Sequence, residues 1–134
     1  MTLSYNRVHV WIGSNFCADE DYLAYFALDY SAEGDFDAPG YKLCGFCRDI
    51  GVPWYDEDFI GVMPRHRNNV SLDDILVDAA VDRDEFDAVK RRCKSLGVTQ
   101  ANAIFWYQDA ELRMPEPVNA TFNGLTYIGE FEGD

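Results

Sequence analysis

The chain has 134 residues, of which 48% are hydrophobic and 15% aromatic, and its formal net charge at pH 7 is −13. This composition excludes a disordered chain, and the length predicts a single domain over residues 1–134 whose core needs no metal or disulfide. The negative charge argues against nucleic acid or anionic membrane as a partner, because lysine and arginine are what both of these bind. It favours a basic protein partner. The alternative is that the acidic residues serve only to keep the protein soluble.

No targeting signal or membrane span is expected. The first seven residues lack the apolar core of a signal peptide, and no apolar run approaches the roughly 18 residues that cross a bilayer. A cytoplasmic location is therefore predicted. The four cysteines, Cys17, Cys44, Cys47 and Cys93, are then expected to be reduced thiols.

The first half of the chain predicts a strand and two helices. Apolar and other residues alternate over Arg7–Gly13, as in a strand. Acidic residues then open a helix of about three turns that reaches Tyr30 and turns Leu23 and Phe26 inward. After a loop at residues 33–40, a short helix within Tyr41–Ile50 is expected to end at Gly51.

The second half predicts further helices followed by strands. Residues 54–60 fit either a strand or an irregular stretch. Ser71 and Asp82 each precede an acidic residue by three positions, which is a helix-capping pattern, and Gly97 is expected to end the second of these helices. Strands are expected at residues 101–107, centrally in the sheet, and at residues 125–131.

This order predicts an α/β (α+β) fold. We expect one small mixed, largely antiparallel sheet with about four helices packed on it, as a single pair of layers.

The sharpest short motif is Cys44-Gly45-Phe46-Cys47. Such a pair serves as a dithiol redox centre when a buried strand leads into it, but the preceding residues do not form one. Two structural thiols are the favoured interpretation. A zinc site is the other alternative, for which Cys44 and Cys47 would supply only half of the ligands.

Nothing in the sequence predicts catalysis. His9 lies within a strand, and His66 lies between Arg65 and Arg67 in a polar loop. The serine elbow of hydrolases and the glycine patterns of phosphate-binding loops are both absent from the sequence. We therefore predict no catalytic residue, no cofactor and no metal ligand.

Acidic residues next to aromatic ones mark the candidate partner-binding site. Aromatic anchors combined with charges that select a basic partner are typical of protein interfaces, whereas a merely solvated acidic patch is the alternative. Charge is also segregated, because residues 19–37 contain seven acids and no base. The predicted partner-binding residues are Trp54, Tyr55, Asp56, Glu57, Asp58, Asp19, Glu20 and Asp21.

The chain resembles the Imm22-type immunity proteins of bacterial polymorphic toxin systems. The pieces that carry this resemblance are short but follow one another through most of the chain: Trp11-Ile12-Gly13, Phe16, Asp19-Glu20-Asp21, Gly51 to Phe59, Cys93 to Gly97, Ala101 to Ile104, and Tyr127 to Phe131. The resemblance implies a cytosolic protein, not an enzyme, that blocks a cognate toxin domain, often a nuclease. As a monomer or homodimer, it would bind neither nucleic acid nor membrane. The Cys44–Cys47 segment is a departure from the family pattern, which leaves the redox and zinc hypotheses open.

Overall fold

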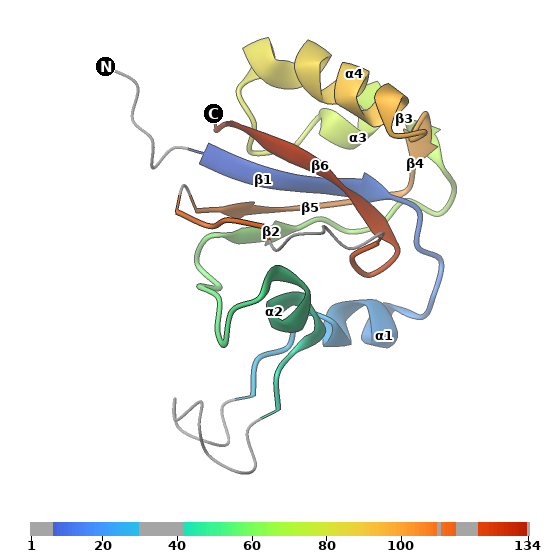
Figure 1. Cartoon of the computed structure of the whole chain (residues 1–134). Coiled ribbons are helices and arrows are strands. Elements are labelled where there is room, and N and C mark those ends of the chain that lie inside the picture. Colours follow the sequence, from blue (N-terminus) through green and yellow to red (C-terminus); the bar gives the residue numbers. More distant parts are fainter. Residues whose placement is uncertain (1–6, 30–41, 110, 115–120, 134) are drawn as a thin grey trace.

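A four-stranded antiparallel sheet with the strand order β2-β5-β1-β6 organises the molecule (Figure 1). The computed structural model describes residues 7–29, 42–109, 111–114 and 121–133. The strands of this sheet are β1 (Arg7–Gly13), β2 (Ile60–Val62), β5 (Ala103–Gln108) and β6 (Leu125–Glu132). A second sheet consists of β3 (Val70–Ser71) and β4 (Gln100–Ala101).

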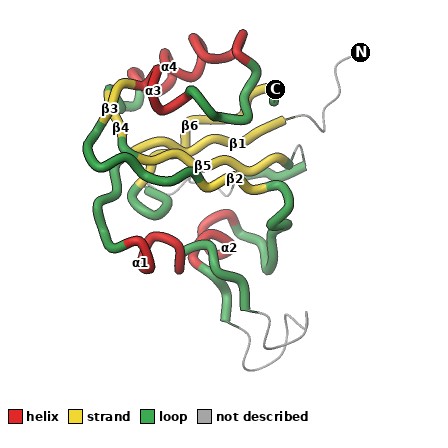
Figure 2. Tube along the Cα trace, turned by 180° about the vertical axis from the view of Figure 1, so that it is seen from behind, coloured by secondary structure: helices red, strands yellow, loops and turns green. Residues whose placement is uncertain are grey.

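Helices cover both faces of the four-stranded sheet. On one face lie α3 (Leu72–Leu76) and α4 (Phe86–Ser95), and on the other lie α1 (Asp19–Ala24) and α2 (Gly45–Ile50) (Figures 1 and 2). A short 3₁₀ helix, Arg83–Glu85, precedes α4. The predicted α+β class and antiparallel sheet are confirmed. The helices were expected to form a single pair of layers with the sheet, whereas the structure places them on both sides.

The sequence of β1 explains why both faces are covered. Val8, Val10 and Ile12 point into the core under α3 and α4, whereas Trp11 points into the core on the opposite face. His9 lies on the Trp11 side, and both are buried. A strand that is buried on both faces needs a helical layer on each side, as in sheets with helices on both surfaces.

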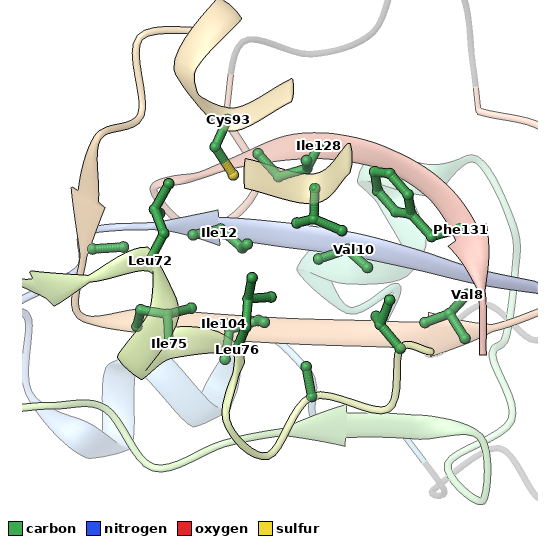
Figure 3. Close-up of a cluster of buried hydrophobic side chains, with 14 residues drawn as sticks. Val8, Val10, Ile12, Leu72, Ile75, Leu76, Cys93, Ile104, Ile128 and Phe131 are labelled. Carbon is green, nitrogen blue, oxygen red and sulfur yellow. The ribbon is translucent and has the colours of Figure 1, made fainter. Parts of the chain in front are cut away.

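The core under α3 and α4 is mostly aliphatic, with the Phe131 ring at one end of the cluster (Figure 3). Val89 and Cys93 of α4 and Leu76 of α3 pack in this core against Ile104 and Ile128 of the sheet. α4 ends as predicted, since Gly97 takes a left-handed φ of +84° and its N–H donates to the Lys94 carbonyl. The Val98 N–H donates to the Cys93 carbonyl, which completes a Schellman cap.

The core under α1 and α2 is aromatic. The Trp11 ring stacks on Phe105 with ring centroids 4.9 Å apart, and Phe46 of α2 meets Trp11 edge-on at 5.4 Å. Phe26 and Tyr55 also pack in this cluster. Such offset and edge-to-face pairs stabilise a core beyond the area that they bury.

α1 is shorter than the sequence predicts. It ends at Ala24, and Tyr30, at the end of the predicted helix, lies outside the described residues, as does the predicted loop at 33–40. The Tyr25 carbonyl accepts the N–H of Phe46, so α2 takes the acceptor that another helical turn would use. Phe26 is buried as predicted, but Leu23 is 56% exposed, because Tyr22 is the residue of α1 that faces the core.

The predicted strand at residues 101–107 is interrupted at Asn102. Its backbone N–H donates to the Gly13 carbonyl, and its side-chain amide bonds Asn15 and His66, so this residue separates β4 from β5. β5 is central in the sheet, as predicted. The final strand is also confirmed, with a bulge opposite the Val10–Trp11 step that keeps Tyr127 beside Trp11.

Candidate partner-binding surface

The segment between α2 and β2 is irregular up to Phe59, and its side chains divide into exposed and buried ones. Trp54 and Phe59 are 43% and 50% exposed, and Glu57 and Asp58 are also exposed. Two large aromatic rings therefore face solvent on either side of two carboxylates. This is the arrangement of aromatic anchors and selecting charges that characterises interface hot spots.

Asp56 holds this turn in place. Its carboxylate accepts the Asp58 N–H at 3.0 Å, and its carbonyl accepts the Phe59 N–H at 3.0 Å. Its own N–H donates to the Tyr107 hydroxyl at 2.9 Å, which ties the turn to β5. Because Asp56 is half-buried and engaged in this way, Glu57 and Asp58 are the carboxylates that the turn presents outward.

Tyr55 is a correction to the predicted set. It is only 2% exposed, its ring meets Phe46 edge-on at 5.0 Å, and its hydroxyl donates to the Phe26 carbonyl. The ring is therefore part of the aromatic core and is not available to a partner. Tyr55 positions Trp54 and Asp56 by fixing the backbone between them.

The first turn of α1 carries the second acidic group. Asp19, Glu20 and Asp21 are all exposed, and the preceding Ala18 provides no side-chain cap. Carboxylates there suit the positive end of a helix. Because Tyr22 and Tyr55 pack in the same aromatic core, this group and the 54–59 turn belong to the same side of the sheet.

Arg65 is an anchor that the sequence did not single out. Its Nη2 donates to Asp19 Oδ1 at 2.6 Å, and its Nη1 donates to the carbonyl and the side-chain oxygen of Asn15, both at 2.9 Å. The guanidinium carbon also lies 4.5 Å from the Tyr22 ring centroid. No periodicity marks such a residue in a loop; only the fold brings residues 15, 19 and 65 together.

Cys44 and Cys47 are both buried and unbridged. Cys44 is the N-cap of α2, and its sulfur accepts the Cys47 N–H at 3.2 Å. A hydrogen bond from the Cys47 thiol lowers the pKa of Cys44 to about 7 and raises that of Cys47. In the described part of the chain, no group of three or more His, Cys, Asp or Glu side chains could hold a metal ion.

His9 is buried in β1, and both of its ring nitrogens have hydrogen-bond partners. Nδ1 lies 2.7 Å from the Tyr127 hydroxyl, and Nε2 lies 3.1 Å from the Asp109 carbonyl oxygen. A neutral ring satisfies both contacts when Nε2 donates and Nδ1 accepts. Desolvation lowers the pKa of His9, although the Glu130 carboxylate, 3.4 Å from Nε2, opposes this shift.

Comparison with known proteins identifies the family of this fold. A family model described as Immunity protein 22 matches residues 8–134, from the first strand through the last. The chain belongs to this family. The match covers both candidate acidic groups and both cores, so the predicted resemblance is confirmed. No curated protein and no solved structure matches the chain. Among the described residues of this family member, no helix is both long and apolar enough to cross a membrane.

Proposed function

We propose that this protein binds and neutralises a cognate bacterial toxin domain through the two acidic groups on the α1–α2 side of the sheet. The observation that carries the proposal is membership of the Immunity protein 22 family over residues 8–134. The contact residues would be Asp19, Glu20, Asp21, Trp54, Glu57 and Asp58, with Asp56 and Tyr55 holding the turn in position.

Charge supports a basic toxin domain as the partner. A net charge of −13 accelerates the approach of a positively charged protein and disfavours nucleic acid. A nuclease fits this description, because its substrate-binding surface must be basic. By covering that surface, the immunity protein would exclude the substrate without catalysis, a cofactor or contact with a membrane. It would act in the cytoplasm, as a monomer or homodimer.

Protection of cells tests the proposal. A candidate toxin domain from the neighbouring genes is expressed with the wild-type protein or with a Glu57→Lys/Asp58→Lys variant, and survival is counted. The matched control, Asp84→Lys/Glu111→Lys, reverses two exposed acids outside the proposed surface. We expect the wild type and the control to protect and the variant to fail. Toxicity that persists with the wild-type protein present would contradict the proposal.

A second candidate function is dithiol redox chemistry at Cys44 and Cys47. The observation in its favour is that Cys44 caps a helix while its pKa falls to about 7, as in dithiol oxidoreductases. The burial of both thiols opposes it. Insulin reduction with dithiothreitol as the electron source separates the candidates. Insulin reduction by the wild type that disappears in Cys44→Ser would favour the redox function. No insulin reduction by the wild type would rule out the redox function.

A further inference from the structure

Two hollows lie on either side of the connection between β2 and β3. The first, here called the α3 hollow, has a volume of about 370 Å³, and the second, the α1 hollow, about 320 Å³. Met63 and Pro64 line both, so these two residues form their shared wall. Both volumes are at the small end of the roughly 300–1,000 Å³ typical of ligand sites, a size that suits single side chains of a protein partner.

The α3 hollow combines apolar walls with carboxylates that carry uncompensated charge. Ile75 and Ile104, both labelled in Figure 3, are buried in the aliphatic core and contribute apolar lining together with Met63. Val77 at the end of α3 is 65% exposed and also belongs to the lining. Val77 therefore adds accessible apolar surface at the rim of this hollow, where an alkyl chain could contact it.

The charge of the α3 hollow comes from Asp74 and Asp78, which are both exposed lining residues. In the part of the chain that the structure describes, neither of them forms an ion pair, whereas neighbouring Asp73 is paired with Lys90 at 2.8 Å. His66 is the one basic side chain of this lining, and the Asn102 amide is already bonded to Asn15 and His66. Apolar walls with two carboxylates suit a cationic head on an alkyl stem.

The α1 hollow has a different character. Its lining includes Leu23, Val62 and Tyr22, and its one carboxylate, Asp19, is already paired with Arg65. A second cation would meet the Arg65 guanidinium, which disfavours lysine or arginine here. A large apolar side chain avoids this repulsion and would cover Leu23, which is otherwise exposed.

We propose that the toxin domain inserts an arginine or lysine side chain into the α3 hollow and a neighbouring large apolar side chain into the α1 hollow, on either side of Met63 and Pro64. This inference rests on the proposed function and extends it, because it adds a surface on α3 to the acidic groups of the α1–α2 side. The cationic head would pair with Asp74 and Asp78, and the alkyl stem would contact Val77 and Ile75. The fit of charge and shape at adjacent hollows would give specificity for the toxin.

A fragment experiment tests the α3 hollow without a toxin. n-Butylguanidinium carries the head and stem of arginine, and n-butylsulfonate has a similar stem with the opposite charge. We expect n-butylguanidinium to give saturable NMR shifts at the methyl groups of Met63, Ile75 and Val77 at millimolar concentration, and the sulfonate to give none. These shifts should disappear in Asp74→Asn/Asp78→Asn and persist in Asp84→Asn/Glu111→Asn. Equal shifts with both fragments, or none with either, would overturn the proposal.

A second arm measures the affinity of the wild-type protein and its variants for the candidate toxin domain used in the protection test. Asp74→Asn/Asp78→Asn should weaken binding by about tenfold or more, and Asp84→Asn/Glu111→Asn should not. Thermal unfolding of each variant verifies folding. Unchanged affinity in Asp74→Asn/Asp78→Asn, with Glu57→Lys/Asp58→Lys still impaired, would overturn this inference and leave the proposed function standing. A toxin that does not bind the wild-type protein would instead contradict the proposed function, and the fragment result would still decide the chemistry of the hollow.

Discussion

The Arg65 guanidinium bonds the Asp19 carboxylate at 2.6 Å while lying over the ring of Tyr22, three positions after Asp19 in the same helix. Arg65 is mostly buried, with 9% of its side chain exposed, whereas the Asp19 side chain is 93% exposed. A buried cation thus holds an exposed carboxylate of the proposed partner surface. The connection after β2 and the first turn of α1 are fixed to each other by this pair.

Arg65→Ala should cost more stability than Asp19→Asn. The arginine substitution removes the ion pair, both bonds to Asn15 and the contact with Tyr22, so we expect a loss of about 2–3 kcal/mol. The aspartate substitution breaks only an exposed pair, which is typically worth less than about 1 kcal/mol. Urea unfolding of both variants measures the difference. Equal costs would show that Arg65 acts only through Asp19.

Buried His9 should reduce stability on the acid side. Since desolvation lowers its pKa below the ordinary 6.5, the unfolded chain binds the proton more readily than the folded one. Above the ordinary histidine pKa of about 6.5, His9 is neutral in both states and the folded state keeps its full stability. As the pH falls from there through the lowered pKa of the folded state, part of that stability is lost. His9→Gln should therefore lose less stability than the wild type between pH 7.5 and 5.5. A loss equal to that of the wild type would contradict the assignment of a neutral His9.

The Cys44 thiol should ionise at a lower pH than an ordinary cysteine. With the pKa of Cys44 near 7 and that of Cys47 raised, one thiolate should form around neutral pH and be seen by its ultraviolet absorbance. Cys44→Ser should abolish this step and keep a hydroxyl oxygen at the helix N-cap. If the step survived in Cys44→Ser, another thiol would be its source.

Two tryptophans should separate stability from binding. Trp11 is fully buried and stacked on Phe105, so Trp11→Ala should cost about 3–5 kcal/mol in unfolding free energy. Trp54 is 43% exposed, and Trp54→Ala should cost less than about 1 kcal/mol yet weaken toxin binding by about tenfold. Chemical denaturation and isothermal titration calorimetry measure the two quantities. A Trp54→Ala variant that binds normally would remove this ring from the interface.

Much of the fold could be predicted from the sequence, because strand alternation and helix capping depend on residues that are close together in the chain. Alternation identified β1, and the Ser71 hydroxyl does accept the Asp74 N–H as its capping pattern predicts. The features that the sequence did not predict depend on hydrogen bonds between residues far apart in the chain. The length of α1 depends on the Tyr25 carbonyl bonding Phe46, and the break at Asn102 depends on bonds to Gly13 and Asn15.

The surface that we propose for partner binding could be located only in part from the sequence. The sequence locates acids and rings together at residues 54–59, but only packing separates exposed Trp54 from buried Tyr55. Both are large aromatic residues in the same short segment, so their types alone do not indicate which one is buried. The two hollows have no local signature at all, because residues of α1, of α3 and of the segment after β2 form them.

The most direct test of the account is the dissociation constant of the complex with the candidate toxin domain used in the protection test, measured at increasing salt. We expect wild-type affinity to fall as salt rises, and Glu57→Lys/Asp58→Lys to lose at least about tenfold at low salt, because both changes weaken attraction between an acidic surface and a basic one. The control variant Asp84→Lys/Glu111→Lys should bind like the wild type. An affinity that neither salt nor Glu57→Lys/Asp58→Lys changes would contradict the acidic surface as the toxin-binding site.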